Sequence, residues 1–466
     1  MTITTITNLL FFLTILPITS PTLTSTITLP LSHFTKHSHS PPQNIYKHLN
    51  HLATTSLTRA RHLKNATTTA TTTTTTTPLS AHSYGGYSIS LGFGTPPQTL
   101  PFIMDTGSSF VWFPCTHNYI CEKCTFATSP SNITSFIPKL SSTAEIVGCL
   151  NPKCGLIHNP NTESRCSDCA PNSVNCTQLC PPYVIIYGSG STGGLALLDT
   201  LTLNYEKVPG FLVGCSLFSL SQPAGIAGFG RGDSSVPSQL GLTKFCYCSI
   251  SHNFDDGNVT TPLTLTGKEN SDEKVNGVTY TPLLKNPKIP TKKSFQEYYY
   301  LGLNKILVGG KKVKYNGDFL SPPDAVTGFG GTIVDSGTTF TYMAREIYEP
   351  LAREIEAQVR EYKRAEEVEN VTGLRPCFNV PRLETVSLPS LSFHYKGGAK
   401  MEFPLENYFS IAGKNEAVCL TVVTDEPGQE MVSGPKVILG NYQQQNYYVE
   451  YDLKHNKFGF KPQKCG

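Results

Sequence analysis

Phe102-Ile-Met-Asp105-Thr106-Gly107-Ser108-Ser109 is the stretch that decides how this 466-residue chain is interpreted. A near-copy, Gly331-Thr-Ile-Val-Asp335-Ser336-Gly337-Thr338-Thr339, follows 230 residues later, and each copy stands behind an apolar run typical of a β-strand. One such motif alone fits an ordinary Asp-Gly turn at the end of a strand. Two copies indicate two related lobes, each of which brings one carboxylate to a shared site.

The repeat extends to a second pair of motifs. Ala224-Gly-Ile-Ala-Gly228-Phe-Gly, downstream of the first Asp motif, matches Val437-Ile-Leu-Gly440-Asn downstream of the second. Elsewhere, short β-branched and aromatic runs alternate with Gly, Pro, Asn and Asp, and helical periodicity is concentrated at residues 344–369. The chain is therefore predicted to be mostly β, with two related lobes at residues 84–270 and 271–466.

Two Asp side chains at one site have a characteristic chemistry. Carboxylates held close together cannot both ionise easily, so the pair shares one proton. Of Asp105 and Asp335, we expect the ionised member to take a proton from a water molecule that attacks a carbonyl, while the protonated member polarises that carbonyl. The reaction needs neither a metal ion nor a cofactor, and the sequence predicts none.

The residues that follow each Asp have expected supporting roles. The first carries a hydroxyl that can hydrogen-bond across the lobe junction, the second is a glycine that lets the backbone turn tightly, and the third carries a hydroxyl that can donate to the carboxylate. These supporting residues are Thr106, Gly107, Ser108, Ser336, Gly337 and Thr338.

At these motifs the chain resembles the pepsin-like aspartic proteases, and more closely their plant nepenthesin-like branch, from about residue 84 to residue 466. The closer match rests on Trp112 with Cys115, Tyr187-Gly188-Ser189-Gly190-Ser191, Gly228-Phe-Gly-Arg-Gly232, Tyr298-Tyr-Tyr-Leu-Gly-Leu and Gly440-Asn-Tyr-Gln-Gln-Gln-Asn-Tyr-Tyr-Val-Glu-Tyr-Asp452. The resemblance implies a bilobal pepsin-like fold with a cleft between the lobes. It also implies a monomeric endopeptidase that hydrolyses polypeptide substrates at acidic pH.

The same resemblance assigns a flap over the cleft. It places Tyr187 on a β-hairpin, with its hydroxyl near Trp112, the only tryptophan of the chain. The alternative is that both are ordinary core or turn aromatics. Many members of the family carry an Asp where this chain has Ser189, so the resemblance also allows a different substrate preference.

The N-terminal region is expected to be processed. Residues 1–20 contain an apolar run that ends near small residues, which is typical of a secretory signal peptide, with a membrane anchor as the alternative. No other apolar run is long enough to predict stable insertion in a membrane. Residues 21–83 are rich in Thr and His and are expected to bury little surface. We interpret them as a removable pro-segment, with a plain linker or an O-glycosylated stalk as the alternative.

Fifteen cysteines fit an oxidising compartment. The two Cys-x-x-Cys pairs between Cys115 and Cys180 could in principle bind zinc, but behind a signal peptide disulfides are favoured. The glycosylation sequons agree with secretion to the extracellular space or cell wall, with the vacuole as an alternative; they are Asn65, Asn132, Asn175, Asn258 and Asn370. By resemblance the expected disulfides are Cys248–Cys465, Cys377–Cys419, Cys115–Cys121 and Cys124–Cys215.

The charge is unevenly distributed along the chain. Residues 1–104 hold five Lys or Arg and no acid, so the remaining residues are slightly acidic and no basic patch predicts nucleic-acid binding. The five basic residues, all within the expected pro-segment, are Lys36, Lys47, Arg59, Arg61 and Lys64. We expect this segment to lie against the ionised Asp pair at neutral pH and to leave on acidification.

Two other classes of protein were weighed against a peptidase. One is a non-catalytic binding protein on the same scaffold, such as a plant inhibitor of cell-wall-degrading enzymes. The other is a structural cell-wall glycoprotein, which suits the Thr-rich stretch but not the long globular remainder. The intact pair of Asp motifs favours the peptidase, because inhibitory relatives commonly lose part of one motif.

Overall fold

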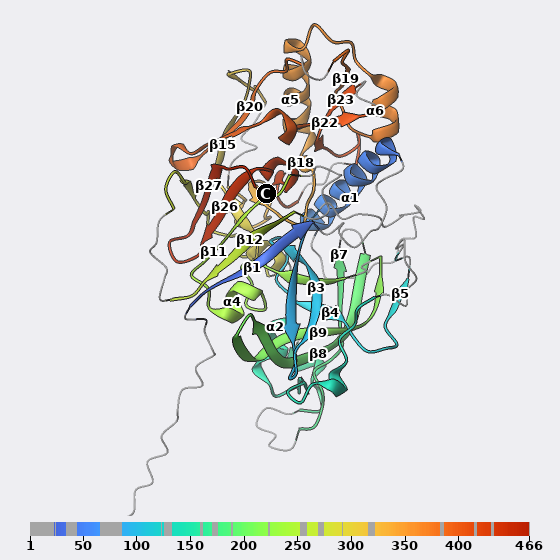
Figure 1. Ribbon diagram of the computed structural model, residues 1–466, viewed down its shortest axis with the longest axis vertical. Helices are drawn as coiled ribbons and strands as arrows, with labels where there is room; N and C mark the ends of the chain where they lie inside the picture. The colour runs from blue at the N-terminus through green and yellow to red at the C-terminus, as the bar shows by residue number, and fades with distance from the viewer. Residues whose placement is uncertain are drawn as a thin grey trace, which may run out of the picture.

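The computed structural model of the protein describes two N-terminal segments and the two lobes (Figure 1). The described residues are 23, 25–33, 44–65, 86–122, 124, 133–158, 162–169, 176–187, 190–221, 224–251, 259–268, 275–290, 292–315, 322–382, 386–413, 417–429 and 433–465. The predicted signal peptide, three of the sequons (Asn132, Asn175 and Asn258), and the flap residues Gly188 and Ser189 lie outside them.

One large sheet runs through the molecule in the order β13-β27-β26-β11-β12-β1-β2-β3-β10-β4-β9-β8-β6, with β5 beside β9 and β7 beside β8. Its strands are β1 (Thr26–His33), β2 (Tyr87–Phe93), β3 (Gln98–Asp105), β4 (Trp112–Pro114), β5 (Ile120–Glu122), β6 (Glu145–Ile146), β7 (Tyr183–Tyr187), β8 (Gly190–Leu203), β9 (Glu206–Leu220), β10 (Gly225–Gly228), β11 (Lys244–Cys248), β12 (Thr260–Thr266), β13 (Thr279–Pro282), β26 (Tyr447–Asp452) and β27 (Lys457–Pro462).

Three smaller sheets build the second lobe, in the upper half of Figure 1. The first has the strand order β14 (Tyr299–Leu301), β17 (Thr332–Val334), β25 (Val437–Leu439), β18 (Thr341–Met343) and β24 (Val422–Val423). The second has the order β16 (Lys311–Lys312), β15 (Leu303–Val308), β20 (Leu391–Tyr395) and β21 (Lys400–Phe403). The third has the order β19 (Cys377–Asn379), β23 (Ala417–Leu420) and β22 (Phe409–Ala412). The described helices are α1 (Ile45–Asn65), α2 (Pro152–His158), α3 (Thr162–Arg165), α4 (Val236–Leu240), α5 (Arg345–Gln358) and α6 (Glu366–Thr372). The predicted mostly β, bilobal fold is confirmed.

The two halves share one local arrangement of strands. In the first lobe β3 pairs in parallel with β10, which also pairs antiparallel with β4. In the second lobe β17 pairs in parallel with β25, which also pairs antiparallel with β18. Each Asp motif and its partner Gly motif therefore form adjacent strands, which gives the sequence repeat a structural meaning.

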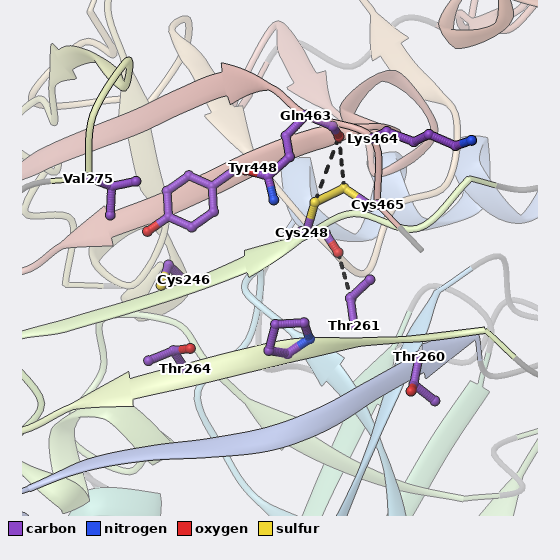
Figure 2. Close-up of a pocket in the computed structure, with 11 residues that line it drawn as sticks. Cys246, Cys248, Thr260, Thr261, Thr264, Val275, Tyr448, Gln463, Lys464 and Cys465 are labelled. Carbon is purple, nitrogen blue, oxygen red and sulfur yellow. Dashed lines mark hydrogen bonds between the residues drawn. A yellow bond between two sulfur atoms is a disulfide. The ribbon is translucent and has the colours of Figure 1, made fainter.

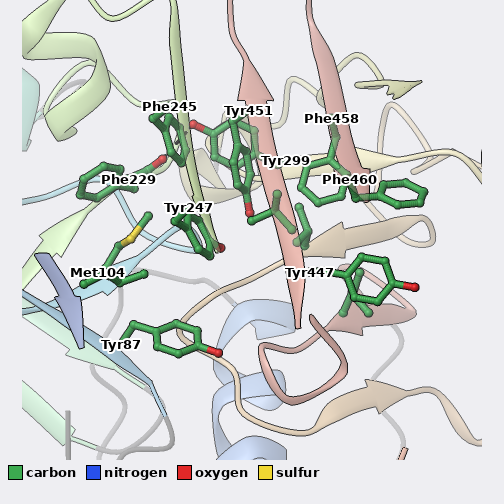
Figure 3. Packing of buried hydrophobic residues seen from close by; sticks show 14 of the residues in the cluster. Tyr87, Met104, Phe229, Phe245, Tyr247, Tyr299, Tyr447, Tyr451, Phe458 and Phe460 are labelled. Carbon is green, nitrogen blue, oxygen red and sulfur yellow. Dashed lines mark hydrogen bonds between the residues drawn. The ribbon is translucent and has the colours of Figure 1, made fainter. Parts of the chain in front are cut away.

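Aromatic side chains fill the interior where the strands of both halves meet (Figure 3). Phe245 on β11 stacks on Tyr451 of β26, with ring centroids 4.4 Å apart and an angle of 10° between the planes. Tyr299 meets Tyr451 edge-on at 4.7 Å. Offset and edge-to-face pairs of this kind add about 0.5–1.5 kcal/mol each to their burial. The core thus fixes the lobes on a common support beneath the two Asp motifs.

The N-terminal segments are packed more closely than the sequence predicted. β1 pairs along its length with β12 and at its end with β2, and α1 buries Leu49, Leu52 and Leu63. The expectation that residues 21–83 bury little is wrong for these two elements. The apolar residues of β1 and α1 recur at the spacing of a strand and of a helix, respectively. They are few among many threonines, so the composition of the segment did not indicate these two elements.

α1 lies against the second lobe, where it contacts α6, β18, β22 and β24 (Figure 1). Its Ser56 hydroxyl accepts a hydrogen bond of 2.9 Å from the backbone N–H of Phe340. Tyr298 and Ser433 donate from their hydroxyls to the carbonyl oxygens of Leu63 and Lys64, at 3.2 and 2.6 Å. The helix therefore supplies partners for polar groups of the lobe as well as apolar contacts. None of the described helices combines the length and apolar character that a bilayer crossing requires.

Two of the four expected disulfides are present and two are wrong. Cys248–Cys465 and Cys377–Cys419 form as expected, but Cys115 pairs with Cys215, and Cys121 pairs with Cys124. The reason is strand register: β4 and β9 run side by side, which brings the Cα atoms of Cys115 and Cys215 within 5.0 Å. The remaining disulfides are Cys149–Cys166, Cys154–Cys180 and Cys169–Cys176.

The odd cysteine is Cys246, which is buried on β11. It borders a cavity of roughly 270 Å³ whose wall also includes Thr264, Tyr448 and the disulfide of Cys248 with Cys465 (Figure 2). Burial raises the pKa of the Cys246 thiol, which keeps it protonated and unreactive. This cavity is lined by β11, β12, β26 and the C-terminal segment, and not by either Asp motif.

Of the described sequons, Asn370 is exposed on α6, and Asn65 is the last residue of α1. Glycosylation at all five positions stays a prediction.

Candidate active site

The two Asp motifs come together between the lobes. Asp105 ends β3 and Asp335 follows β17, and both residues are buried, at 2% and 0% exposure. A Cβ atom added to Gly107 would lie 2.6 Å from Oδ1 of Asp335, and one added to Gly337 would clash with Oδ1 of Asp105. Each carboxylate therefore sits over the glycine of the opposite motif. A side chain at either glycine would displace the carboxylate that it faces.

The hydrogen bonds of the two carboxylates are related by the repeat. Ser108 Oγ donates to Asp105 Oδ2 at 2.5 Å, and Thr338 Oγ1 donates to Asp335 Oδ2 at 2.5 Å. The backbone N–H two residues after each Asp donates to its Oδ1, at 3.0 Å in the first motif and 2.9 Å in the second. Donors of this kind favour the ionised form of a carboxyl group.

The remaining hydroxyls connect the motifs to each other. The backbone N–H of Thr106 donates to Ser336 Oγ at 3.0 Å, and the backbone N–H of Ser336 donates to Thr106 Oγ1 at 2.8 Å. Ser336 Oγ donates in turn to the carbonyl oxygen of Met104 at 2.9 Å. These buried bonds cross the lobe junction, so they fix the distance between the two Asp loops. All six supporting residues lie at the two carboxylates or across the junction between them, and their role in catalysis stays a prediction.

A cation from the N-terminal segment lies between the two carboxylates. Arg59 of α1 donates from Nη2 to Asp105 Oδ1 at 2.6 Å and from Nε to Asp335 Oδ2 at 3.2 Å. Its side chain is 11% exposed. A guanidinium is planar and always charged, so it can neutralise both carboxylates at once. Arg59 was one of five basic residues that the sequence offered for this contact, and nothing in the sequence singled it out.

The environment pushes the pKa values of the two carboxyl groups apart. Burial and the charge of Asp335 raise the pKa of Asp105, although Arg59 opposes them. Burial would also raise the pKa of Asp335, but Arg59, the Thr338 hydroxyl and the Gly337 N–H outweigh it and leave that pKa lowered. Asp335 is therefore the member that holds the negative charge, and Asp105 is the member that is easier to protonate.

The expected flap residues are in contact beside the first motif. Trp112 donates from Nε1 to the Tyr187 hydroxyl at 2.8 Å, and both side chains are buried with Ile103 of β3. Tyr187 ends β7, which pairs with β8 as a hairpin. Burial, followed by the charge of Asp105, raises the pKa of Tyr187, so its hydroxyl stays protonated. The contact fits both a flap and a packed aromatic pair, and the role of Tyr187 stays a prediction.

The sequence reasoning missed a second ionic site at the end of α1. Lys64 and Arg61 reach Asp425, at 3.4 and 3.5 Å, beside Tyr342 of β18. Asp425 stands alone in the sequence without a motif, so no local signal marks it.

Known proteins resemble this chain over most of its length. Residues 87–260 match a family described as xylanase inhibitor N-terminal, and residues 298–462 match xylanase inhibitor C-terminal. A probable aspartyl protease of Arabidopsis thaliana is 32% identical over 442 residues, which cover 83% of each chain. Aspartic proteinase nepenthesin-1 of Nepenthes gracilis is 30% identical over 390 residues, which cover 82% of this chain and 78% of that one.

Solved structures share the fold at lower identity. The crystal structure of EDGP aligns with a TM-score of 0.63 at 19% identity and covers 96% of both chains. Basic 7S globulin from soybean aligns with a TM-score of 0.58 at 17% identity, and the alignment covers 95% of this chain and 96% of that one. At these identities the likeness concerns the fold alone.

Proposed function

Because the chain belongs to the plant nepenthesin-like aspartic proteases and is an aspartic-type peptidase, we propose that it is a secreted endopeptidase that uses Asp105 and Asp335 to hydrolyse peptide bonds at acidic pH. The observation that carries this proposal is the pair of buried carboxylates, each held over the glycine of the opposite motif. The lobes at residues 84–270 and 271–466 would bind a polypeptide between them. We propose that the protein acts as a monomer in the extracellular space, cell wall or vacuole.

The division of labour applies to the pair after Arg59 has left, so it does not follow from the pKa shifts that Arg59 causes. The ionised member of the pair takes a proton from water as the oxygen attacks the scissile carbonyl carbon. The protonated member gives its proton to the carbonyl oxygen. When the tetrahedral intermediate collapses, the C–N bond breaks and the amine leaves with a proton from the pair. Sharing one proton between two Asp residues is established for aspartic proteases as a class.

Residues 21–83 fit a pro-segment that keeps this pair inactive. Arg59 binds both carboxylates from the space where water and the scissile bond would sit. A carboxylate bound to an arginine cannot act as a base, so the enzyme would be active only after α1 leaves. This favours an inhibitory pro-segment over a plain tether. Its proteolytic removal after the predicted signal peptide, residues 1–20, would complete maturation.

Tyr187 is proposed as the flap residue. Its hydrogen bond from Trp112 holds the ring beside β3, the strand that carries Asp105. A hairpin that closes over substrate excludes water other than the nucleophile.

The alternative function is a non-catalytic inhibitor on the same scaffold, because both matching families are described as xylanase inhibitors. A binding protein does not need two complete Asp motifs. Here both carboxylates and all six supporting residues are in place, which favours the peptidase.

The deciding experiment is digestion of a peptide library at pH 3–6 by acid-incubated protein, with Asp105→Asn and Asp335→Asn as matched controls. We expect cleavage by the wild type that both substitutions and a transition-state-mimicking inhibitor abolish. Cleavage by either variant would contradict the assignment, and inhibition of a xylanase without any peptide cleavage would favour the alternative.

A further inference from the structure

The end of helix α1 buries a lysine in a site of the second lobe that has all the features of a cation pocket. Lys64 Nζ donates to the Tyr342 hydroxyl at 2.5 Å and lies 3.4 Å from Asp425 Oδ2, and the side chains of Lys64 and Asp425 are each 1% exposed. The ammonium also lies 4.7 Å from the centroid of the Tyr342 ring. A carboxylate, a hydroxyl and an aromatic ring are three groups that bind an ammonium.

The pocket belongs to the lobe and not to the helix. Tyr342 is on β18, and Asp425 follows β24, its parallel neighbour. Tyr342 donates from its hydroxyl to Asp425 Oδ2 at 2.5 Å, so the lobe orders its own acceptor. The pocket therefore persists when α1 departs.

The departure of α1 removes the cations that face Asp425. Among the described residues, its ion pairs are with Lys64 and with Arg61, and both come from α1. Glu346 and Lys436, whose charges also act on Lys64, remain and form an ion pair with each other. The opened pocket then presents Asp425, held by the Tyr342 hydroxyl, without its cations from α1, so it can bind a new cation.

The helix gives the separation of the pocket from the Asp pair. Lys64 is five residues after Arg59, which places the two positions about 7–8 Å apart along the helix axis and about 140° apart around it. An extended peptide covers the same distance in about two to three residues, at about 3.3 Å each. A side chain at that distance from the scissile bond could therefore enter the pocket.

We propose that Asp425 and Tyr342 form a specificity pocket that binds a lysine or arginine side chain of the substrate after α1 has left. This inference rests on the proposed peptidase function and adds a substrate preference to it. Within the zymogen, Lys64 occupies the pocket as a stand-in for that side chain.

The test compares matched peptides cleaved by the acid-activated full chain. Each pair of peptides differs only by lysine or norleucine at a position two or three residues from the bond that the library identifies as cleaved. We expect kcat/KM to favour lysine by at least about tenfold in the wild type and the preference to fall towards one in Asp425→Asn. Glu426→Gln is the matched control, because it removes the neighbouring exposed charge, and it should keep the preference.

An additional variant and an additional measurement cover the case in which Asp425→Asn does not fold. Asp425→Asn leaves Lys64 buried without its carboxylate, so the variant is also made together with Lys64→Met to preserve folding. Denaturant unfolding of the wild type, both single variants and the double variant then measures the coupling of the pair in the intact zymogen.

The outcomes separate the two hypotheses. If norleucine peptides are cleaved and lysine gives no advantage, the pocket assignment is wrong while the peptidase stands. If the wild type cleaves no more than Asp105→Asn, the proposed function fails. The pocket is then judged by the coupling free energy between Lys64 and Asp425, measured by denaturant unfolding of the four proteins. Zero coupling between Lys64 and Asp425 would then overturn the pocket as well.

Discussion

Replacing Arg59 by methionine tests directly whether α1 is held at the Asp pair by charge. Methionine keeps much of the length of the side chain and removes the guanidinium that binds both carboxylates. Removing one partner of a buried ion pair costs about 3–5 kcal/mol. Since 1.4 kcal/mol is a factor of ten, the fraction of molecules with α1 undocked should rise by about two to three and a half orders of magnitude.

The size of this effect depends on pH in a defined direction. Arg59 lowers the pKa of Asp335 in the docked state, so its contribution is complete above the ordinary carboxyl pKa and is lost as pH falls through the lowered value. The substitution should therefore act most strongly at pH 7 and progressively less in acid. Burial leaves the pKa of Asp105 raised even beside Arg59, so this carboxyl protonates first.

Hydrogen exchange of the α1 backbone amides in the full-length protein at pH 7 measures docking without relying on activity. We expect Arg59→Met to lose protection throughout α1, and Lys47→Met, which removes an exposed charge from the same helix, to retain it. In a fluorogenic peptide assay at pH 5.5, Arg59→Met should begin cleavage without the lag of the wild type. Unchanged protection and an unchanged lag in Arg59→Met would refute the proposed inhibitory contact.

Three further predictions follow from the site. Asp105→Asn and Asp335→Asn should each lower kcat by several orders of magnitude with unchanged thermal melting of the activated enzyme, from which Arg59 is absent, and the double variant should be no worse than either, because the pair acts as a unit. Tyr187→Ala should lower kcat strongly but shift the melting temperature little, whereas a purely structural tyrosine would show the reverse. His62→Gln should flatten the acid-induced release of α1, measured by hydrogen exchange from pH 6.5 to 4. Burial, followed by the charge of Arg59, lowers the pKa of His62 from 6.5 to about 4, although Asp335 opposes the shift. His62 therefore binds its proton at higher pH when the helix is undocked, so docking weakens as pH falls from 6.5 to 4. A wild-type release curve that is flat over this interval would contradict the argument.

The parts of the site that the sequence predicted are those with local signals. The family and the bilobal fold are confirmed, because an Asp motif followed by a Gly motif repeats in the same order in both halves. The turn chemistry around Asp105 and Asp335 is also local: the glycine and hydroxyl positions follow from tight backbone turns and carboxylate hydrogen bonds. The residues that meet these requirements lie within a few positions of each Asp, so a single sequence is enough to identify them.

The parts that the sequence did not predict depend on contacts between distant residues. The pairing of Cys115 with Cys215 is set by the register of β4 on β9, which spacing alone does not reveal. The effect of the pro-segment histidines on acidification likewise depends on contacts that the sequence does not show. Burial determines whether protonation of these histidines favours or opposes docking of α1. Desolvation, together with the charge of His51, lowers the pKa of His48 to about 4, so protonation of His48 opposes docking.

The helical form of α1 fits the proposed role of a pro-segment that occupies the Asp pair without being cut. A helix satisfies its own backbone N–H and C=O groups, so it offers no extended bond to the Asp pair. Its side chains instead present cations in two places, Arg59 at the carboxylates and Lys64 at Asp425. The acidic groups proposed to bind an extended basic substrate thus hold a helix in this structure. Under the proposed mechanism, acid weakens this docking in two ways: it neutralises the Asp pair that binds Arg59, and it charges histidines that are buried only while the helix is docked.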